Sequence, residues 1–344
     1  MRSVYASLVF VLVSVPLMGG TTLGVSVDTS LAVLITVDQS GKGDFQRIQD
    51  AIDAVPSFNS EQVFILIKPG IYRERVVVPE DKPWITLSGT NATSTIITWS
   101  GAWDTLESTT VSILAPDFVG RHLTIQNAYG AGAQAVALSV FGDRVAFYAC
   151  RMISYQDTLF DISERHYYSN CYIEGATDFI FGNALSFFEK CHIHSTSKSG
   201  GAITAQKRSS VDENTGFSFV SCKLTGVKSK SVFLGRPWGP YSRVVYADTY
   251  MSNAILPQGW SDWNNAITQR TSFYGEYKCY GSGARNTTRV KWSHQLLTLD
   301  EATPFITQTW INGQDWIRSN PTHFKKPSFP LKNEGDGLES LDGY

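Results

Sequence analysis

The feature that most constrains the fold is a repeat of about 20 residues in the middle of the chain. Cysteines mark its clearest column, and successive cysteines of that column are 21, 20 and 31 residues apart. The last interval is long because the polar segment 198–216 interrupts the repeat as an inserted loop. An aromatic residue stands three positions before each cysteine, and an apolar residue stands two positions after it. The three columns are Cys150, Cys171, Cys191 and Cys222; Phe147, Tyr168, Phe188 and Phe219; and Met152, Ile173, Ile193 and Leu224.

A period of this length is typical of a solenoid in which one repeat makes one coil. Residues two apart on a strand face the same side, so each cysteine and the apolar residue after it point inward together. Like residues on successive coils then stack into ladders inside the solenoid. The pattern therefore predicts an all-β fold, a parallel β-helix. A chance period in a β-sandwich is the alternative, and it would have to align three columns over four copies.

A single helix is expected before the repeats, over residues 45–55. Its apolar side chains recur at helical spacing, Asp44 can cap its start, and Pro56 ends it. The apolar residues that share its face are Phe45, Ile48, Ile52 and Val55. We expect this N-terminal helix to cap the open end of the first coil.

Residues 1–24 have the pattern of a signal peptide, with Arg2 as the positive charge before a short apolar core. A membrane span would need about 20 apolar residues, so membrane anchoring is the weaker interpretation. The expected organisation is then a short segment at 25–33, one β-helix domain at 34–319 and a surface tail at 320–344. A solenoid can use this length as one domain, because each coil contacts only its neighbours.

The chain is slightly acidic, with a net charge of −2 and a pI of about 6.3. A nucleic-acid partner needs a basic surface, so that class of function is excluded, and an acidic substrate would have to be held by local groups. Asn91 and Asn286 begin glycosylation sequons, in keeping with a secreted glycoprotein. The five cysteines leave two alternatives open, stacked buried thiols or a disulfide within the ladder.

Two aspartates share one phase of the repeat. Asp157 and Asp178 are 21 residues apart, and each follows a cysteine by seven positions. They are therefore expected on neighbouring coils, where adjacent strands lie about 4.8 Å apart. Two carboxylates this close cannot both ionise cheaply, so the pKa of one of them should rise. The pair would supply a nucleophile or base together with an acid near neutral pH.

Amide, guanidinium and indole side chains accompany this pair. Gln156 precedes Asp157 and Gln134 comes one coil earlier, and both amides can donate hydrogen bonds to an oxyanion. Arg236 can hold a carboxylate in its ionised form, and Trp238 offers a flat face for a sugar ring or a methyl group. The set fits ester hydrolysis, but a retaining glycosidase also uses two carboxyls about 5–5.5 Å apart. Each residue taken singly could equally belong to a structural hydrogen-bond network.

Longer strings around these residues resemble the plant pectin methylesterases, and they occur in the order of that family over residues 34–319. The matching strings are Asp38–Phe45, Gly70–Glu74, Gln134–Leu138, Tyr155–Leu159, Asp178–Gly182, Leu234–Trp238 and Tyr274–Tyr277. The resemblance implies a right-handed parallel β-helix that hydrolyses the methyl esters of galacturonate units in pectin and releases methanol. It also implies a secreted monomer of the cell wall, with pectin and a proteinaceous methylesterase inhibitor as partners and without nucleic-acid or membrane partners.

The resemblance assigns a role to each matching side chain. Asp178 would be the nucleophile and Asp157 the general acid and base, with Arg236 orienting the nucleophile. The oxyanion hole would come from Gln134 and Gln156. Substrate contacts would come from Trp238, Tyr155, Phe181 and Thr124. The family uses neither a cofactor nor a metal.

Some positions depart from the family pattern. Phe160 stands where tyrosine is usual, Ser139 stands where arginine is frequent, and Ala-Tyr-Gly at 128–130 replaces Thr-Ala-Gly near the cleft. These changes bear on substrate preference more than on chemistry. We also expect no long helical pro-region, because the domain begins soon after the signal peptide.

Two other functions stay open, a catalytically silent pectin-binding wall protein and a different β-helix enzyme that degrades polysaccharides. A lyase would need a cluster of calcium-binding carboxylates, which the sequence does not show, and a glycosidase would leave the two glutamines unexplained. His192 and His194 could form a metal pair, but surface or core histidines are the favoured interpretation. Of Trp260 and Trp263, one is expected in the core and one in the groove. The segment 198–208 is expected to be a solvated loop, with a subsite for substrate carboxylates as the minority interpretation.

Overall fold

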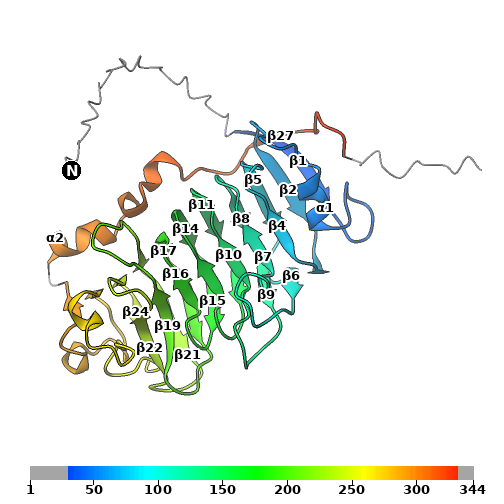
Figure 1. Cartoon of the computed structure of the whole chain (residues 1–344). Helices are drawn as coiled ribbons and strands as arrows, with labels where there is room; N and C mark the ends of the chain where they lie inside the picture. Colours follow the sequence, from blue (N-terminus) through cyan, green and yellow to red (C-terminus); the bar gives the residue numbers. More distant parts are fainter. Residues whose placement is uncertain (1–29, 297, 332–344) are drawn as a thin grey trace, which may run out of the picture.

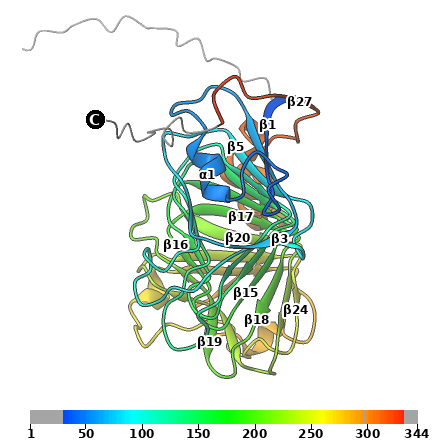
Figure 2. The same ribbon diagram turned by 90° about the vertical axis from the view of Figure 1, so that its right-hand side faces the viewer.

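The computed structural model describes residues 30–296 and 298–331. In these residues every pair of neighbouring strands is parallel, and the strands form three sheets around one core (Figures 1 and 2). The chain passes through sheets A, B and C in turn, and most coils add one strand to each sheet. This winding is a right-handed parallel β-helix, so the fold predicted from the repeat is confirmed.

Within each sheet, neighbouring strands come from successive coils of the chain. In this spatial order, sheet A comprises β26 (His294–Gln295), β25 (Phe273–Tyr277), β23 (Arg243–Ala247), β20 (Gly216–Val220), β17 (Leu185–Glu189), β14 (Arg165–Ser169), β11 (Val145–Tyr148), β8 (Val119–Arg121), β5 (Ile85–Gly89), β2 (Val63–Ile67), β1 (Leu31–Val37) and β27 (His323–Lys325). Sheet B comprises β24 (Tyr250–Met251), β21 (Lys223–Gly226), β18 (His192–Ser195), β15 (Tyr172–Gly175), β12 (Arg151–Ile153), β9 (Thr124–Asn127), β6 (Thr95–Trp99) and β3 (Gly70–Arg73). Sheet C comprises β22 (Val232–Pro237), β19 (Gly201–Gln206), β16 (Ile180–Gly182), β13 (Leu159–Asp161), β10 (Leu138–Val140), β7 (Val111–Ile113) and β4 (Val76–Val78). The helices are α1 (Ile48–Asp53), α2 (Leu299–Ala302), and the 3-10 turns η1 (Thr268–Arg270), η2 (Asn286–Thr288), η3 (Thr303–Phe305), η4 (Gln308–Ile311) and η5 (Gly313–Asp315).

The repeat columns form ladders in the interior. The aromatic rings of Phe147, Tyr168, Phe188 and Phe219 stack on one another, with successive centroids 5.5, 4.6 and 4.4 Å apart. Offset stacks of this kind add about 0.5–1.5 kcal/mol per pair beyond the apolar area that they bury. The cysteine column lies in the same core, and all five cysteines are free thiols, as the stacked-thiol alternative requires.

One residue turns the chain from sheet A into sheet B in most coils. That residue has a left-handed backbone, for example Asn170 with φ 53° before Cys171 and Lys190 with φ 54° before Cys191. The residues at this position are His122, Ala149, Asn170, Lys190, Ser221, Asp248 and Lys278. A left-handed φ is uncommon for residues that carry a Cβ, so each corner is strained and the stacked ladders on both sides must offset that strain.

Helix α1 covers the first coil as predicted, but it is shorter than the predicted span 45–55. Phe45 pairs with the end of β1 in an isolated bridge, and the Asp44 carboxylate accepts a hydrogen bond from a backbone N–H of β1, so neither residue belongs to the helix. The cap comes instead from Glu74 of the next coil, whose carboxylate accepts hydrogen bonds from the first two backbone N–H groups of α1. Lys82 donates to two carbonyl oxygens of the last turn, so the coil holds both ends of the helix.

After the last coil, the chain returns along the outer face of sheet A (Figure 1). We call residues 298–325 the return segment. Its Trp310 indole N–H donates to a carbonyl oxygen of β17 at 3.2 Å, and its Arg318 reaches Asp117 beside β8. The segment ends in β27, which pairs with the edge strand β1 in the register Leu31 to His323. The described part of the predicted surface tail from residue 320 is exposed or half-buried, and its residues His323–Lys325 add an edge strand to sheet A.

The prediction of a solvated loop over 198–208 is wrong in its middle, because Gly201–Gln206 form β19, a buried strand of sheet C. The first strand begins at Leu31, three residues before the predicted start of the domain. Asn91 of the first sequon is exposed in the turn before β6, while the predicted signal peptide at 1–24 lies outside the described residues. None of the helices within 30–296 and 298–331 is long and apolar enough to cross a membrane.

Candidate active site

The corner between sheets B and C carries both predicted catalytic aspartates. Asp157 lies between β12 and β13, and Asp178 lies between β15 and β16. Both have a left-handed backbone, with φ 62° and 50°. The Asp157 N–H donates to the carbonyl oxygen of Thr177 at 3.4 Å, and the Asp178 N–H donates to that of Ala202 at 2.7 Å. The turns of successive coils therefore stack, and they place the two aspartates on neighbouring coils as the repeat predicts.

A cavity of about 340 Å³ opens at this corner onto the outer face of sheet C. It gathers the two aspartates with residues from several other turns and strands. The predicted residues that line it are Gln134, Gln156, Asp157, Asp178, Phe181, Arg236 and Trp238. Residues between 134 and 238 in the sequence thus meet at one site because each coil returns the chain to the same corner.

Arg236 and Asp178 form the main ion pair of the cavity. The arginine Nε donates to Oδ1 at 2.7 Å and Nη2 donates to Oδ2 at 2.6 Å, and each side chain is 15% exposed. The ring of Trp263 lies against the guanidinium, 3.7 Å from its carbon to the ring centroid. A bidentate, charge-assisted pair of this kind favours the ionised carboxylate.

Asp157 has the opposite electrostatic environment. Burial raises the pKa of its carboxyl to about 7, and the nearby negative charge of Asp178 contributes to the rise. Arg236 and a hydrogen bond from Gln156 act in the other direction but are the smaller effects. One carboxyl of the pair therefore titrates near neutral pH, which confirms the expectation that the pKa of one of them rises.

Aromatic rings form one wall of the cavity. Phe160 and Phe181 stack with centroids 4.4 Å apart, and Trp238 lies 5.9 Å from Phe181 and 6.3 Å from Phe160. The exposed Lys207 places its ammonium 4.6 Å from the Trp238 ring centroid. The wall offers flat apolar faces with one cation at its rim. Phe160, in place of the usual tyrosine, packs behind this wall against Phe181 and brings no hydroxyl group to it.

Two residues predicted to contact substrate lie elsewhere. Thr124 is buried in β9 of sheet B, where its hydroxyl donates to the carbonyl oxygen of Ala92 at 2.6 Å. Tyr155 is half-buried at the start of the catalytic turn and does not line the cavity. Ser139, in place of the frequent arginine, is buried in β10 and donates to the hydroxyl of Ser112 at 3.0 Å.

Three further residues line the cavity, namely Trp263, Thr105 and Ala205. The expectation that Trp260 and Trp263 divide between core and groove is confirmed, since Trp260 is 1% exposed whereas Trp263 is 57% exposed and lines the cavity. Thr105 also lines it, from the loop between β6 and β7. Nothing in the sequence singled out Thr105, because that loop has no periodic pattern to place it.

The two histidines of β18 lie on the outer face of sheet B. His192 and His194 each place a ring nitrogen within hydrogen-bond distance of the Thr225 hydroxyl, at 2.8 and 2.7 Å, on the outer face of sheet B. Across residues 30–296 and 298–331, no group of three or more histidine, cysteine, aspartate or glutamate side chains is arranged to hold a metal ion. Both histidines are half-buried at the surface, as the favoured interpretation has it.

Comparison with known proteins gives one consistent result. The sequence model of the family described as pectinesterase matches residues 34–314. A relative from Arabidopsis thaliana whose name places it among the pectinesterases is 55% identical over 311 residues, which cover 90% of this chain and 88% of the relative. The structure of the pectin methylesterase from carrot superposes with a TM-score of 0.79 and 36% identity, over 85% of this chain and 95% of that chain. A pectin methylesterase solved in complex with a hexasaccharide superposes with a TM-score of 0.71 and 28% identity, over 84% of this chain and 98% of that chain.

Proposed function

Because the chain belongs to the pectinesterase family, we propose that its cavity hydrolyses the methyl esters of galacturonate units in pectin, with Asp178 as nucleophile and Asp157 as acid and base. The protein is a carboxylic ester hydrolase, and its products are methanol and de-esterified pectin. A related pectin methylesterase binds a hexasaccharide, which supports a polymeric sugar as the substrate. The observation that carries the proposal is the meeting of two carboxyls, two amides and one guanidinium in one cavity.

In the first half of the reaction, the Asp178 carboxylate attacks the carbonyl carbon of the ester. Arg236 donates a hydrogen bond to each oxygen of this carboxylate and fixes its orientation. The new C–O bond moves an electron pair onto the carbonyl oxygen, and the amides of Gln134 and Gln156 donate hydrogen bonds to that oxyanion. Asp157, in its protonated form, transfers its proton to the methoxy oxygen as the ester bond breaks, and methanol leaves.

In the second half, water cleaves the anhydride formed between Asp178 and the galacturonate carbonyl. Asp157 is now ionised and takes a proton from the water as its oxygen attacks the carbonyl carbon. Asp178 departs as a carboxylate, which restores its ion pair with Arg236, and Asp157 ends protonated. The galacturonate product releases its own proton to the solvent. The site then holds the charges with which it began.

The aromatic wall supplies the binding surface for the substrate in this proposal. The exposed face of Trp238 and the stacked pair Phe160 and Phe181 suit the apolar faces of sugar rings and the ester methyl group. Trp263 covers Arg236 and limits the access of water to the ion pair. Lys207 sits at the rim, where a free carboxylate of the polymer would meet it.

One assay tests the proposal against its alternatives. Methanol release and chain length should be measured together on highly methylated pectin. We expect methanol without any shortening of the polymer. Shortening would support a lyase or a glycosidase, and pectin binding without either product would support a silent wall protein.

Secretion into the cell wall is part of the proposal, supported by the family's cell-wall substrate and by the signal-peptide pattern at 1–24. We also propose a monomer, since one chain supplies every residue of the cavity. A proteinaceous methylesterase inhibitor as a partner stays a prediction. Expression of the full chain in plant cells, with the enzyme assayed in the wall fraction, checks the location.

A further inference from the structure

The outer face of β18 carries two histidines whose ring nitrogens converge on one point. His192 and His194 are two residues apart, so their side chains lie on the same face of the strand. Nε2 of His192 lies 2.8 Å from the hydroxyl oxygen of Thr225, and Nδ1 of His194 lies 2.7 Å from that same oxygen. The rings are steeply inclined to each other, at 77°, with their centroids 6.0 Å apart. Two imidazoles therefore approach a single oxygen atom of the neighbouring strand β21.

The Thr225 hydroxyl cannot donate to both rings. A threonine has one O–H hydrogen, so the hydroxyl donates to one imidazole and accepts an N–H hydrogen from the other. One ring nitrogen therefore already directs its lone pair at the hydroxyl oxygen, and a change of tautomer directs the lone pair of the second nitrogen there as well. Imidazole nitrogens bind Zn²⁺ at about 2.0–2.1 Å. An ion in the place of the hydroxyl oxygen needs each ring to move closer by only about 0.7 Å.

The surroundings favour the neutral form of the rings, which is the form that a metal ion needs. Burial lowers the pKa of His192, and the positive charges of Lys223 and His194 act in the same direction. The neighbouring strand β15 packs Tyr172 beside both rings, with centroids 5.2 Å from His192 and 6.2 Å from His194 (Figure 2). Glu174 of that strand pairs in register with His194 and brings a carboxylate to the same face, which attracts a cation.

We propose that His192 and His194 bind a divalent transition-metal ion, Cu²⁺ or Zn²⁺, between their two ring nitrogens. The ion takes the place of the Thr225 hydroxyl, and water molecules complete its coordination. Imidazole suits both ions, and a given set of ligands binds Cu²⁺ more tightly than Zn²⁺. With two protein ligands the site exchanges its ion, unlike the closed four-ligand sites of structural zinc.

This metal site is separate from the proposed reaction. It lies on the outer face of sheet B, whereas the catalytic cavity opens at the corner onto the outer face of sheet C. The ion therefore takes no part in ester hydrolysis. Because it binds the folded strand, it stabilises the native protein in proportion to its concentration above the dissociation constant.

Metal titration of the full chain, produced without a histidine tag, tests the proposal. The variant combines His192→Gln with His194→Gln. The matched control combines His294→Gln with His323→Gln, which removes two exposed histidines from other strands. Calorimetry measures the affinity for Zn²⁺, electron paramagnetic resonance counts the nitrogen ligands of bound Cu²⁺, and circular dichroism checks the fold of each protein.

We expect one ion per chain and two nitrogen ligands in the native protein and in the control. The His192/His194 variant should lose at least about tenfold in affinity, since removing even an outer partner of a metal ligand costs about 10–100-fold. Zn²⁺ should raise the melting temperature of the native protein and of the control but not that of the variant. A native chain that binds no ion, or equal affinities in the native chain and the variant, would overturn the proposal. If the double variant does not fold, His192→Gln alone takes its place.

A third variant tests the position of the ion. Thr225→Val removes the hydroxyl that competes for both rings and keeps the shape of the side chain. Its affinity for Zn²⁺ should equal or exceed that of the native protein. Weaker binding in Thr225→Val would contradict an ion that displaces the hydroxyl. None of these measurements depends on methanol release, so they stand apart from the test of the proposed function.

Discussion

Arg236 reaches Asp178 across one intervening strand of sheet C and forms a two-pronged ion pair with it. The intervening position on that face of the sheet is Ala205, which pairs in register with Phe181 on one side and Arg236 on the other. A methyl group there leaves room for the long arginine side chain to lie across the strand. The nucleophile is thus held by a residue two coils away, and a larger residue at 205 would separate the two.

Replacing Arg236 with lysine should distinguish the effect of the positive charge from the effect of the bidentate hydrogen bonds. Arg236→Lys keeps a cation beside Asp178 but loses the fork that holds both carboxylate oxygens. We expect kcat for methanol release to fall by about 10- to 150-fold, the cost of one hydrogen bond to a charged group. Asp178→Asn, with its fold checked by circular dichroism, should abolish methanol release. A lysine variant with native kcat would show that charge alone suffices.

The raised pKa of Asp157 predicts how activity depends on pH. Proton transfer to methanol needs the protonated carboxyl, which is lost as pH rises through the pKa of about 7. We expect kcat/KM for methanol release to decline above about pH 7. The control is Asp157→Asn, whose residual rate should not decline there. An unchanged kcat/KM from pH 6 to pH 9 in the native enzyme would exclude Asp157 as the acid.

The same pKa has a consequence for stability. An unfolded aspartate ionises near pH 4, whereas folded Asp157 stays protonated up to about pH 7, so the folded state binds more protons between these values and stability falls as pH rises. Asp157→Asn removes the titrating carboxyl, so this loss of stability with rising pH should be absent in the variant. The variant should gain little over the native chain at pH 4 and up to about 4 kcal/mol at pH 8. Urea unfolding of both proteins at the two pH values measures the difference, and a gain independent of pH would contradict it.

The two glutamines should affect the chemical step. If each donates one hydrogen bond to the oxyanion, Gln134→Ala and Gln156→Ala should each lower kcat by about 10²–10³. The ester binds before the oxyanion forms, so KM should change little. Initial rates of methanol release over a range of pectin concentrations separate the two constants. A rise in KM with unchanged kcat would assign the glutamines to ground-state binding.

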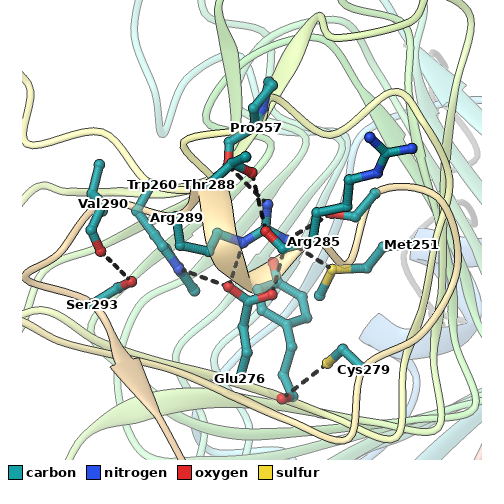
Figure 3. Close-up of polar contacts among 12 residues, drawn as sticks. Met251, Pro257, Trp260, Glu276, Cys279, Arg285, Thr288, Arg289, Val290 and Ser293 are labelled. Carbon is teal, nitrogen blue, oxygen red and sulfur yellow. Dashed lines mark hydrogen bonds and ion pairs between the residues drawn. The ribbon is translucent and has the colours of Figure 1, made fainter.

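The buried pair Glu276 and Arg289 should matter for stability at the last coil (Figure 3). Arg289→Met leaves the Glu276 carboxylate buried without its cation, and we expect a loss of about 3–5 kcal/mol in the free energy of unfolding. Adding Glu276→Leu removes the orphaned charge and should recover part of that loss. Chemical denaturation of both variants measures this. Equal losses would mean that packing, and not the unpaired charge, sets the cost.

The repeat made the coil and the catalytic corner predictable, because a fixed spacing from the cysteines places Asp157 and Asp178 at one position of successive coils. Contacts outside the repeat were not predictable from it. The cap of α1 comes from Glu74, whose distance in the sequence no capping pattern spans. Trp263 lies in an irregular loop after the last strand of sheet C, so the sequence could offer only a choice between it and Trp260.

One inward position was also not predictable. Asp161 ends β13 with its side chain in the interior, fully buried, where it accepts hydrogen bonds from the Tyr168 hydroxyl and from His166 at 2.6 Å each. Aspartates usually lie at the protein surface, so the sequence does not mark Asp161 as an interior residue. Its donors belong to the neighbouring strand of sheet A, and only the folded coil brings them together. The apolar columns of the repeat therefore do not predict every interior residue, because buried polar side chains such as Asp161 form hydrogen bonds with one another there.

The return segment brings a late part of the chain back beside the first strand. Through it, Thr322 donates a backbone hydrogen bond to Ser30, and His323 pairs with Leu31, so the two ends of the described structure lie side by side. A short linker could join them, and the chain could be reopened in the long surface loop before β20 without breaking any strand pair. Such a circularly permuted protein would keep every contact of the catalytic corner. The coils would keep their order in space, while the chain would begin and end in the middle of the β-helix.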